Sequence, residues 1–298
     1  MSAPMADPRI REIPVGPEGG GPYGIAAGPD GAMWTTLAQA GAVARVTVEG
    51  SVTVHDLGFP YGRPTVITAG PDGALWCTLN QVGAIARITT GGDVTTFPLP
   101  DMGAAPFGIC TGPDGALWFT QMSADRIGRI DTAGSVTGFD LPVADGAPSM
   151  ITTGPDGALW FTLNQADAVG RITTGGEVTT VPLPTKGSAP VGLCATPDAL
   201  WAVLIGTGAV ARIAPGGAVT EYPLPDPACR PHAITAADDG TCWFTEWGTG
   251  RIGHITSEGR IAEFPLPDAS SEPHGITVDA EGRVWAALEN GHVAVLSR

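Results

Sequence analysis

The chain consists of short runs of hydrophobic and β-branched residues that alternate with turn residues. Typical runs are LWFT, AIARIT and VTTFPLP, and Gly, Pro, Asp or Asn bound them. Strands of about five residues give this pattern, because Thr, Val and Ile favour extended backbone and the bounding residues favour turns. No segment keeps a hydrophobic period of 3.6 residues, so the sequence predicts an all-β protein with little helix.

The same pattern recurs at a nearly constant interval. Seven tryptophans follow a turn such as P-D-G-A, and they stand at positions 34, 76, 118, 160, 201, 243 and 285. Four short strands in about 40–50 residues are typical of one propeller blade. The sequence therefore predicts one domain over residues 1–298, a seven-bladed β-propeller with four-stranded blades. An open β-solenoid is disfavoured because it would use shorter repeats and need capping units.

The two ends of the chain complement each other. The last repeat stops at GHVAVLSR and lacks a fourth strand. Residues 9–15, RIREIPV, resemble the fourth-strand sequence VTTFPLP and precede the first complete repeat. We expect this N-terminal strand to complete the last blade, which closes the ring and removes two exposed sheet edges.

Three positions of the repeat vary while the rest stays uniform. The residue after the repeat proline, here called the channel position, is Tyr23, Thr65, Phe107, Ser149, Val191, His232 and His274. The pre-proline position holds Arg230 and Glu272, among others, and the post-tryptophan position, four residues after each Trp, holds Trp247 and Glu289. The first strand of a blade begins where the second ends, so all three positions are predicted at one rim of the central channel. Variation at these positions marks them as candidates for chemistry.

Two glutamates of the last repeat are predicted to oppose each other. If the turn at 279–282 centres the hairpin, Glu272 lies opposite Glu289, and His274 shares their face. Opposed carboxylates repel unless a cation compensates, and two carboxylates with open positions suit Mg²⁺ better than zinc. The alternative is a pair splayed into water at the channel mouth, and a one-residue slip would turn Glu289 away.

Neighbouring blades add to this group. The same register in the sixth repeat places Arg230 opposite Trp247, with His232 on the same side, and the first blade contributes Tyr23. A neutral imidazole can act as a base near pH 7, and a metal ion stabilises an enolate that develops beside a carbonyl. Glu246 is predicted on the opposite face, and neither it nor Arg230 receives a role. Surface positions are expected for the remaining histidines, His55, His254 and His292.

Composition restricts the function further. The chain has 30 acidic and 15 basic residues, a net charge of −15, which repels nucleic-acid phosphates. A cation or cationic substrate would fit this charge, and so would simple solubility. No apolar stretch of about 20 residues and no signal-like N-terminus occur, so a cytoplasmic protein without membrane contact is expected. Five cysteines without a C-x-x-C pair predict buried thiols, and short loops predict a monomer.

The repeat P-x-G-I-x-x-G-P-D-G-A-[LM]-W-F-T, with SEPHGI, PHAI and ALENG, resembles the virginiamycin B lyase (streptogramin B lyase) family over the whole chain. The resemblance implies a Mg²⁺-dependent carbon–oxygen lyase that opens type B streptogramins, which are cyclic depsipeptide antibiotics, by elimination at the ester linkage. It implies that Glu272 and Glu289 bind the metal, that His274 is the general base and that His232 contacts the substrate. Tyr23 and Trp247 occupy positions suited to the aromatic side chains of the antibiotic.

Two other functions remain open from the residues alone. A metal-dependent lactonase-type propeller would also use acidic ligands, although its ligands come from several blades and here the acids concentrate in one. A propeller that only binds a ligand or protein at its rim would tolerate loss of His274 without loss of chemistry.

Overall fold

The computed structural model describes residues 9–297, which form seven four-stranded antiparallel sheets. The first four blades comprise β2 (Pro22–Ala27), β3 (Met33–Leu37), β4 (Ala42–Val46) and β5 (Val52–Asp56); β6 (Pro64–Ala69), β7 (Leu75–Leu79), β8 (Ala84–Ile88) and β9 (Val94–Pro98); β10 (Pro106–Thr111), β11 (Leu117–Gln121), β12 (Arg126–Ile130) and β13 (Val136–Asp140); and β14 (Pro148–Thr153), β15 (Leu159–Leu163), β16 (Ala168–Ile172) and β17 (Val178–Pro182). The last three comprise β18 (Pro190–Thr196), β19 (Ala199–Leu204), β20 (Ala209–Ile213) and β21 (Val219–Pro223); β22 (Pro231–Ala236), β23 (Cys242–Glu246), β24 (Arg251–Ile255) and β25 (Ile261–Pro265); and β26 (Pro273–Val278), β27 (Val284–Leu288), β28 (His292–Ser297) and β1 (Arg9–Pro14).

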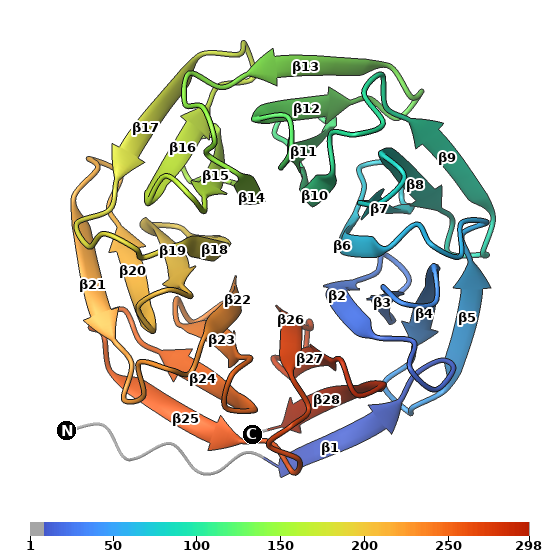
Figure 1. Ribbon diagram of the computed structural model, residues 1–298. Coiled ribbons are helices and arrows are strands. Elements are labelled where there is room, and N and C mark those ends of the chain that lie inside the picture. Colours follow the sequence, from blue (N-terminus) through green and yellow to red (C-terminus); the bar gives the residue numbers. More distant parts are fainter. Residues whose placement is uncertain (1–8, 298) are drawn as a thin grey trace.

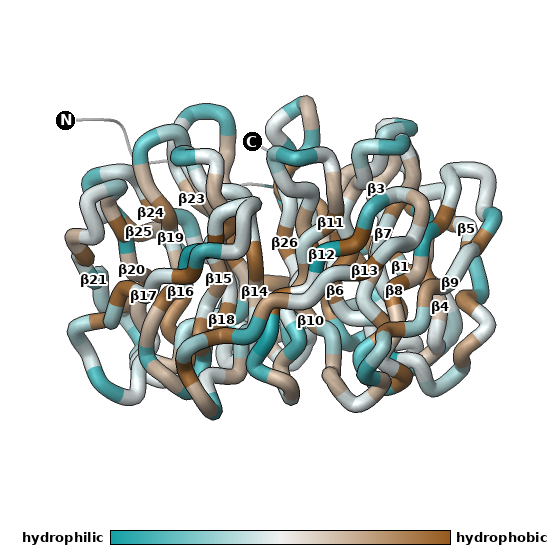
Figure 2. Tube along the Cα trace, turned by 90° about the horizontal axis from the view of Figure 1, so that it is seen from above, coloured by the Kyte–Doolittle hydropathy of each residue, from teal (hydrophilic) through white to brown (hydrophobic). Residues whose placement is uncertain are grey.

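The seven sheets stand around a central channel as propeller blades, which confirms the predicted fold class (Figure 1). The first strand of each blade lies nearest the axis and the fourth lies at the circumference. Seen edge-on, the ring is a flattened disc whose loops project from both faces (Figure 2). No helix among the described residues is long and apolar enough to span a membrane.

The N-terminal strand closes the ring as predicted. Strand β1 pairs antiparallel with β28 from Arg9↔Ser297 to Pro14↔His292, so the seventh blade is made from both ends of the chain (Figure 1). Ile13 and Val15 are buried in the core cluster that joins this blade to the first. Each end thus satisfies the other's hydrogen-bonding edge.

The repeated tryptophans form the blade cores and are tied to the turns before them. In the first four blades the indole Nε1 donates to an aspartate of the turn, and an arginine of the third strand donates to the same carboxylate. Asp114 is an example, with Trp118 at 3.0 Å and Arg129 at 2.7 Å. Although partial burial alone would raise the pKa of Asp114, these hydrogen bonds hold it below its usual value.

A β-bulge near the start of each innermost strand directs the channel position toward the axis. In the seventh blade Pro273 pairs with Leu288, but the next pair is Ile276 with Ala286, so His274 and Gly275 together oppose one residue. The other six blades show the same shift. Bulges of this kind re-aim a side chain. Gly275 also allows close approach of the first blade, because an added Cβ would lie 2.5 Å from the Tyr23 carbonyl oxygen.

Buried threonines connect neighbouring blades directly behind the channel positions. Thr245 Oγ1 donates to the His274 carbonyl oxygen at 2.8 Å and accepts from the Ala233 amide at 2.9 Å. Thr120 makes the same two contacts at the junction of blades three and four, with the Ser149 carbonyl oxygen and the Gly108 amide. The backbone that carries His274 is therefore held by blade six as well as by its own blade.

Other expectations had mixed outcomes. The described cysteines are free, as expected; Cys110 is half-buried and the other four are buried. The surface position predicted for His254 is wrong: its ring is 5% exposed and packs on Trp243, because it replaces an arginine that can extend outward. His55 lies over Trp34 with nearly parallel rings, and His292 contacts Asn290 at an exposed site.

Candidate active site

Four channel-position side chains gather at one end of the channel. The rings of Tyr23 and His274 are stacked with centroids 4.5 Å apart, and His232 meets His274 edge-to-face at 4.7 Å. Phe107 reaches Tyr23 from across the channel at 6.1 Å. The structure thus brings together Tyr23, His232 and His274 from the first, sixth and seventh blades, as the sequence predicted. Phe107 joins them without having been predicted.

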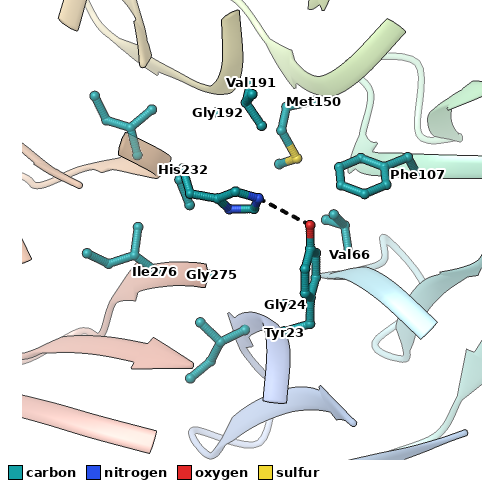
Figure 3. Close-up of a pocket in the computed structure, with 13 residues that line it drawn as sticks. Tyr23, Gly24, Val66, Phe107, Met150, Val191, Gly192, His232, Gly275 and Ile276 are labelled. Atoms are coloured by element: carbon teal, nitrogen blue, oxygen red, sulfur yellow. Dashed lines mark hydrogen bonds between the residues drawn. The ribbon is translucent and has the colours of Figure 1, made fainter. Parts of the chain in front are cut away.

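A hydrogen bond joins two side chains of this group, Tyr23 and His232. The Tyr23 hydroxyl lies 3.2 Å from His232 Nε2, and beneath the pair is an apolar cavity of about 70 Å³ that Val66, Phe107 and Met150 help to line (Figure 3). Burial lowers the pKa of His232 to about 3, and the neighbouring His274 adds to that effect. His232 is therefore neutral at pH 7 and its Nε2 can accept a hydrogen bond from the Tyr23 hydroxyl, so these two side chains form a rigid wall.

His274 lies between this wall and an acidic pair. Its Nε2 is 2.8 Å from Glu289 Oε2, while its Nδ1 has no hydrogen-bond partner among the described residues. The side chain is 8% exposed, and burial lowers the pKa of His274 to about 4, with a further contribution from the Arg63 charge. The imidazole is therefore neutral at pH 7 and has a lone pair with which to accept a proton.

Glu272 and Glu289 are adjacent, but not for the reason that strand alternation suggested. Glu272 has a φ of 49°, in the left-handed region just before β26, so it does not continue the alternation of the strand. The Glu289 amide donates to the Glu272 carbonyl oxygen at 3.2 Å, which is the predicted pairing. Burial and then the Glu289 charge raise the pKa of Glu272, and mutual repulsion of this kind is relieved by a cation.

The donor set fits a metal ion that keeps most of its own water. No group of three or more His, Cys, Asp or Glu side chains among residues 9–297 is arranged to hold a metal. Glu272 and Glu289 could supply two carboxylate ligands to such an ion. Mg²⁺ is bound in this way in many proteins, through one or two carboxylates with water and substrate oxygens.

Trp247 extends the wall on the other side of His274. Its ring lies 6.2 Å from the His274 ring at an angle of 30°, and the Arg230 guanidinium lies over the indole at 5.2 Å. Arg230 therefore packs on the face of Trp247. Glu246 is buried away from this group, where Thr249 donates to it at 2.8 Å, and burial raises its pKa to about 7.

Besides Phe107, two contributors to the site were missed by sequence reasoning. Arg63 occupies the pre-proline position of blade two, and its positive charge acts on both His274 and Tyr23. Thr245 holds the His274 backbone from the neighbouring blade. Arg63 shares its position with Glu272 and Arg230, so the repeat comparison contained a signal for it. Thr245 looks like the other repeated threonines and gave none.

Comparisons with known proteins identify the family of this chain. The sequence profile of the virginiamycin B lyase family matches residues 8–296. Virginiamycin B lyase from Staphylococcus aureus superposes with a TM-score of 0.94 at 40% identity, covering 98% of this chain and 100% of that chain. A catalytically inactive histidine-to-alanine variant of the S. aureus enzyme, solved with quinupristin, gives 0.94 at 39% identity over the same shares.

Curated relatives match over shorter stretches. Virginiamycin B lyase from Mycolicibacterium smegmatis is 67% identical over 36 residues, which are 12% of this chain and 13% of that protein. The aligned stretch thus spans about an eighth of this relative's length. The profile match and the whole-chain likeness decide the assignment and agree with the resemblance seen in the motifs: the chain belongs to the virginiamycin B lyase family.

Proposed function

We propose that the protein inactivates type B streptogramins by opening their ring at the ester linkage, as a Mg²⁺-dependent carbon–oxygen lyase. The observation that carries the proposal is the contact of a neutral, buried histidine, His274, with Glu289, which itself repels the neighbouring carboxylate of Glu272. Membership of the family and the likeness to a relative solved with quinupristin support this choice of substrate class.

His274 is the proposed base. In an elimination, the imidazole takes the proton from the carbon α to a carbonyl of the threonine residue. The electron pair of that C–H bond forms a carbon–carbon double bond, and the bond from the β-carbon to the ester oxygen breaks. The oxygen leaves with its electron pair as a carboxylate, so the product is a linear peptide with a dehydrated threonine and no water is consumed.

Glu272 and Glu289 are the proposed ligands of Mg²⁺. When bound, the ion would polarise the ester carbonyl and stabilise the negative charge that proton removal creates. Glu289 has a second task, because its carboxylate contacts His274 Nε2 and orients the ring. Binding of a cation would also relieve the repulsion that raises the pKa of Glu272.

Tyr23, His232 and Trp247 are proposed to bind the substrate. Tyr23 and Trp247 flank the His274 ring, and the Tyr23–His232 hydrogen bond prevents either side chain from turning away. Aromatic faces fixed in this way suit the apolar and aromatic groups of a cyclic depsipeptide. The rigid wall also excludes water from the base, which favours elimination over hydrolysis.

One assay separates this function from its rivals. The protein is incubated with quinupristin and Mg²⁺, and then with EDTA, and the product is followed by mass and absorbance. Elimination leaves the mass unchanged and creates a conjugated double bond, whereas a lactonase would add one water. Absence of any product with bound quinupristin would indicate a propeller that only binds its ligand, and the proposed function would be wrong.

Substitutions of His274, Glu272 and Glu289 test the role proposed for each residue. His274→Ala is expected to abolish turnover and keep binding, while Glu272→Gln and Glu289→Gln should raise the Mg²⁺ concentration needed for half-maximal rate by tenfold or more, by an order-of-magnitude estimate. Glu177→Gln is a matched control, because Glu177 is an exposed glutamate in the fourth blade. Equal Mg²⁺ dependence in the wild type and the Glu272 and Glu289 variants would refute the metal site.

A further inference from the structure

The loop before blade two departs from its counterparts in the other blades. Residues 57–63 read LGFPYGR, where the loop one blade further reads LPDMGAA and the remaining loops carry mainly Pro, Asp, Ser, Gly or Ala. Phe59 and Tyr61 thus introduce two aromatic rings. Tyr61 is 89% exposed and Phe59 is 36% exposed, although such rings are ordinarily buried. Nothing in the fold requires an aromatic residue here, because the other blades do without one.

This loop is held firmly in place. The Gly62 amide donates to the Phe59 carbonyl oxygen at 2.8 Å, which makes a tight turn with Pro60 and Tyr61 at its centre. The carbonyl oxygens of Gly62 and Arg63 accept from the Gln81 and Asn80 amides at 3.1 and 3.2 Å. A fixed turn presents the Tyr61 ring at low entropic cost, which is how rigid aromatic anchors contribute to binding.

A hollow of about 280 Å³ lies beside the ring. Its lining consists of Ala38, Gln39, Pro60, Tyr61, Arg63 and Gln81. Ala38 is the post-tryptophan residue of blade one, the position that Trp247 fills in blade six. The small alanine side chain leaves open the space that an indole occupies at the junction of blades six and seven.

The hollow lies at the same rim of the channel as the candidate active site, because the Asn80 amide pairs with the Arg63 carbonyl oxygen just as the Glu289 amide pairs with that of Glu272. The post-tryptophan and pre-proline positions lie on the face of the ring that carries Glu272 and Glu289, and blade two is separated from blade seven only by blade one (Figure 1). Arg63, which lines the hollow, acts electrostatically on His274 and Tyr23. Its guanidinium makes no ion pair or hydrogen bond with any residue that the structure describes, so its donors are available to a ligand.

We propose that this hollow binds an aromatic side chain of the depsipeptide substrate, which stacks on Tyr61 while Arg63 donates to a neighbouring carbonyl oxygen. The inference rests on the proposed function and adds to it a second anchor point, one blade away from the base. Two separated anchors fix the rotation of a ring-shaped substrate on the rim, and this decides which ester carbon faces His274. Tyr61 and Arg63 would therefore determine specificity, without acting in the chemical step.

Binding of quinupristin to the His274→Ala protein tests the proposal without interference from turnover. Adding Tyr61→Ala should weaken binding and raise the dissociation constant about tenfold, which is typical of the loss of one well-packed aromatic contact. Tyr61→Phe should bind as tightly as the His274→Ala protein, because the ring face is kept. Arg63→Met should weaken binding several-fold and leave the Tyr61→Ala effect intact. In the active protein, Tyr61→Ala should lower kcat/KM, mainly through KM.

Met102→Ala is the matched control. Met102 is 66% exposed in the equivalent loop one blade further from His274. Its replacement by alanine should leave binding and turnover unchanged. Equal binding by Tyr61→Ala and the control would overturn the proposal, and so would equal losses in Tyr61→Phe and Tyr61→Ala. If wild-type protein binds quinupristin and Tyr61→Ala weakens binding, but no product forms, the proposed chemistry fails and the binding site stands.

Discussion

The hydroxyl of Thr245 is predicted to position the proposed base, His274, from the neighbouring blade. Thr245→Val replaces the hydroxyl with a methyl group of similar size. The His274 carbonyl oxygen and the Ala233 amide, now bonded at 2.8 and 2.9 Å, would each lose a partner. Val203 occupies the corresponding position in blade five, so a valine fits this scaffold.

The expected cost divides between stability and activity. Two polar groups left without partners in a buried site should lower the free energy of unfolding by about 2 kcal/mol, as an order of magnitude. A shift of the His274 backbone by a fraction of an ångström should reduce kcat about 10- to 100-fold, since proton transfer depends steeply on geometry. KM for quinupristin should change little, because the aromatic wall is untouched.

Thr120→Val separates these two effects. Thr120 donates to the Ser149 carbonyl oxygen at 2.6 Å and accepts from the Gly108 amide at 2.9 Å, away from the acidic pair. It should lower the melting temperature as much as Thr245→Val while kcat stays near that of the wild type. Thr245→Ser, which keeps the hydroxyl, should restore kcat. If Thr245→Val and Thr120→Val show the same kcat, the hydroxyl does not position His274.

Three further predictions concern the scaffold. Gly275→Ala should lower the melting temperature and the turnover together, because the new Cβ would lie 2.5 Å from the Tyr23 carbonyl oxygen; wild-type turnover would refute the close approach. The pKa of Asp114 is lowered in the folded state, so the stability that it contributes is present above about pH 4 and is lost as the pH falls through the folded value. The melting-temperature difference between wild type and Asp114→Asn should therefore shrink as the pH falls below the ordinary range of an aspartate, and a constant difference would contradict this. Deletion of residues 1–14 removes β1, so it should expose the edge of β28 and cause aggregation, which light scattering measures. A truncated protein that stays monodisperse would show that β1 is dispensable.

The sequence could predict the ring and the members of the site because both depend on repetition. Each blade contains one buried Trp and four bounded strands, so period and turn chemistry are enough to count the blades. The same uniformity made His232, His274 and Glu272 visible as departures from the repeat. The lone N-terminal strand was recognisable because RIREIPV matches the missing element of the last repeat.

Features that depend on local irregularities of the strands or on packing in three dimensions could not be predicted in this way. The bulge at His274 and Gly275 shifts the hairpin register by one residue, so the pairing deduced from the turn holds only at the rim. The Thr245 bond to the His274 carbonyl spans 29 residues and looks no different in sequence from its counterparts. Burial of His254 depends on the ring packing against Trp243, which no local pattern encodes.

The backbone strain at Glu272 belongs to the fold and not to the site. Ala105, Ala147 and Ala189 occupy the same pre-proline position and have φ values of 51°, 47° and 46°, against 49° for Glu272. A left-handed residue costs about 1 kcal/mol or more wherever it occurs, so every blade bears this cost, and only blade one lessens it with a glycine. The left-handed residue carries its own side chain at the rim, and its carbonyl oxygen accepts from the amide of the post-tryptophan residue of the same hairpin. Glu272 and Glu289 are therefore opposed by geometry that all seven blades share, and the seventh blade becomes a candidate metal site through side-chain chemistry alone.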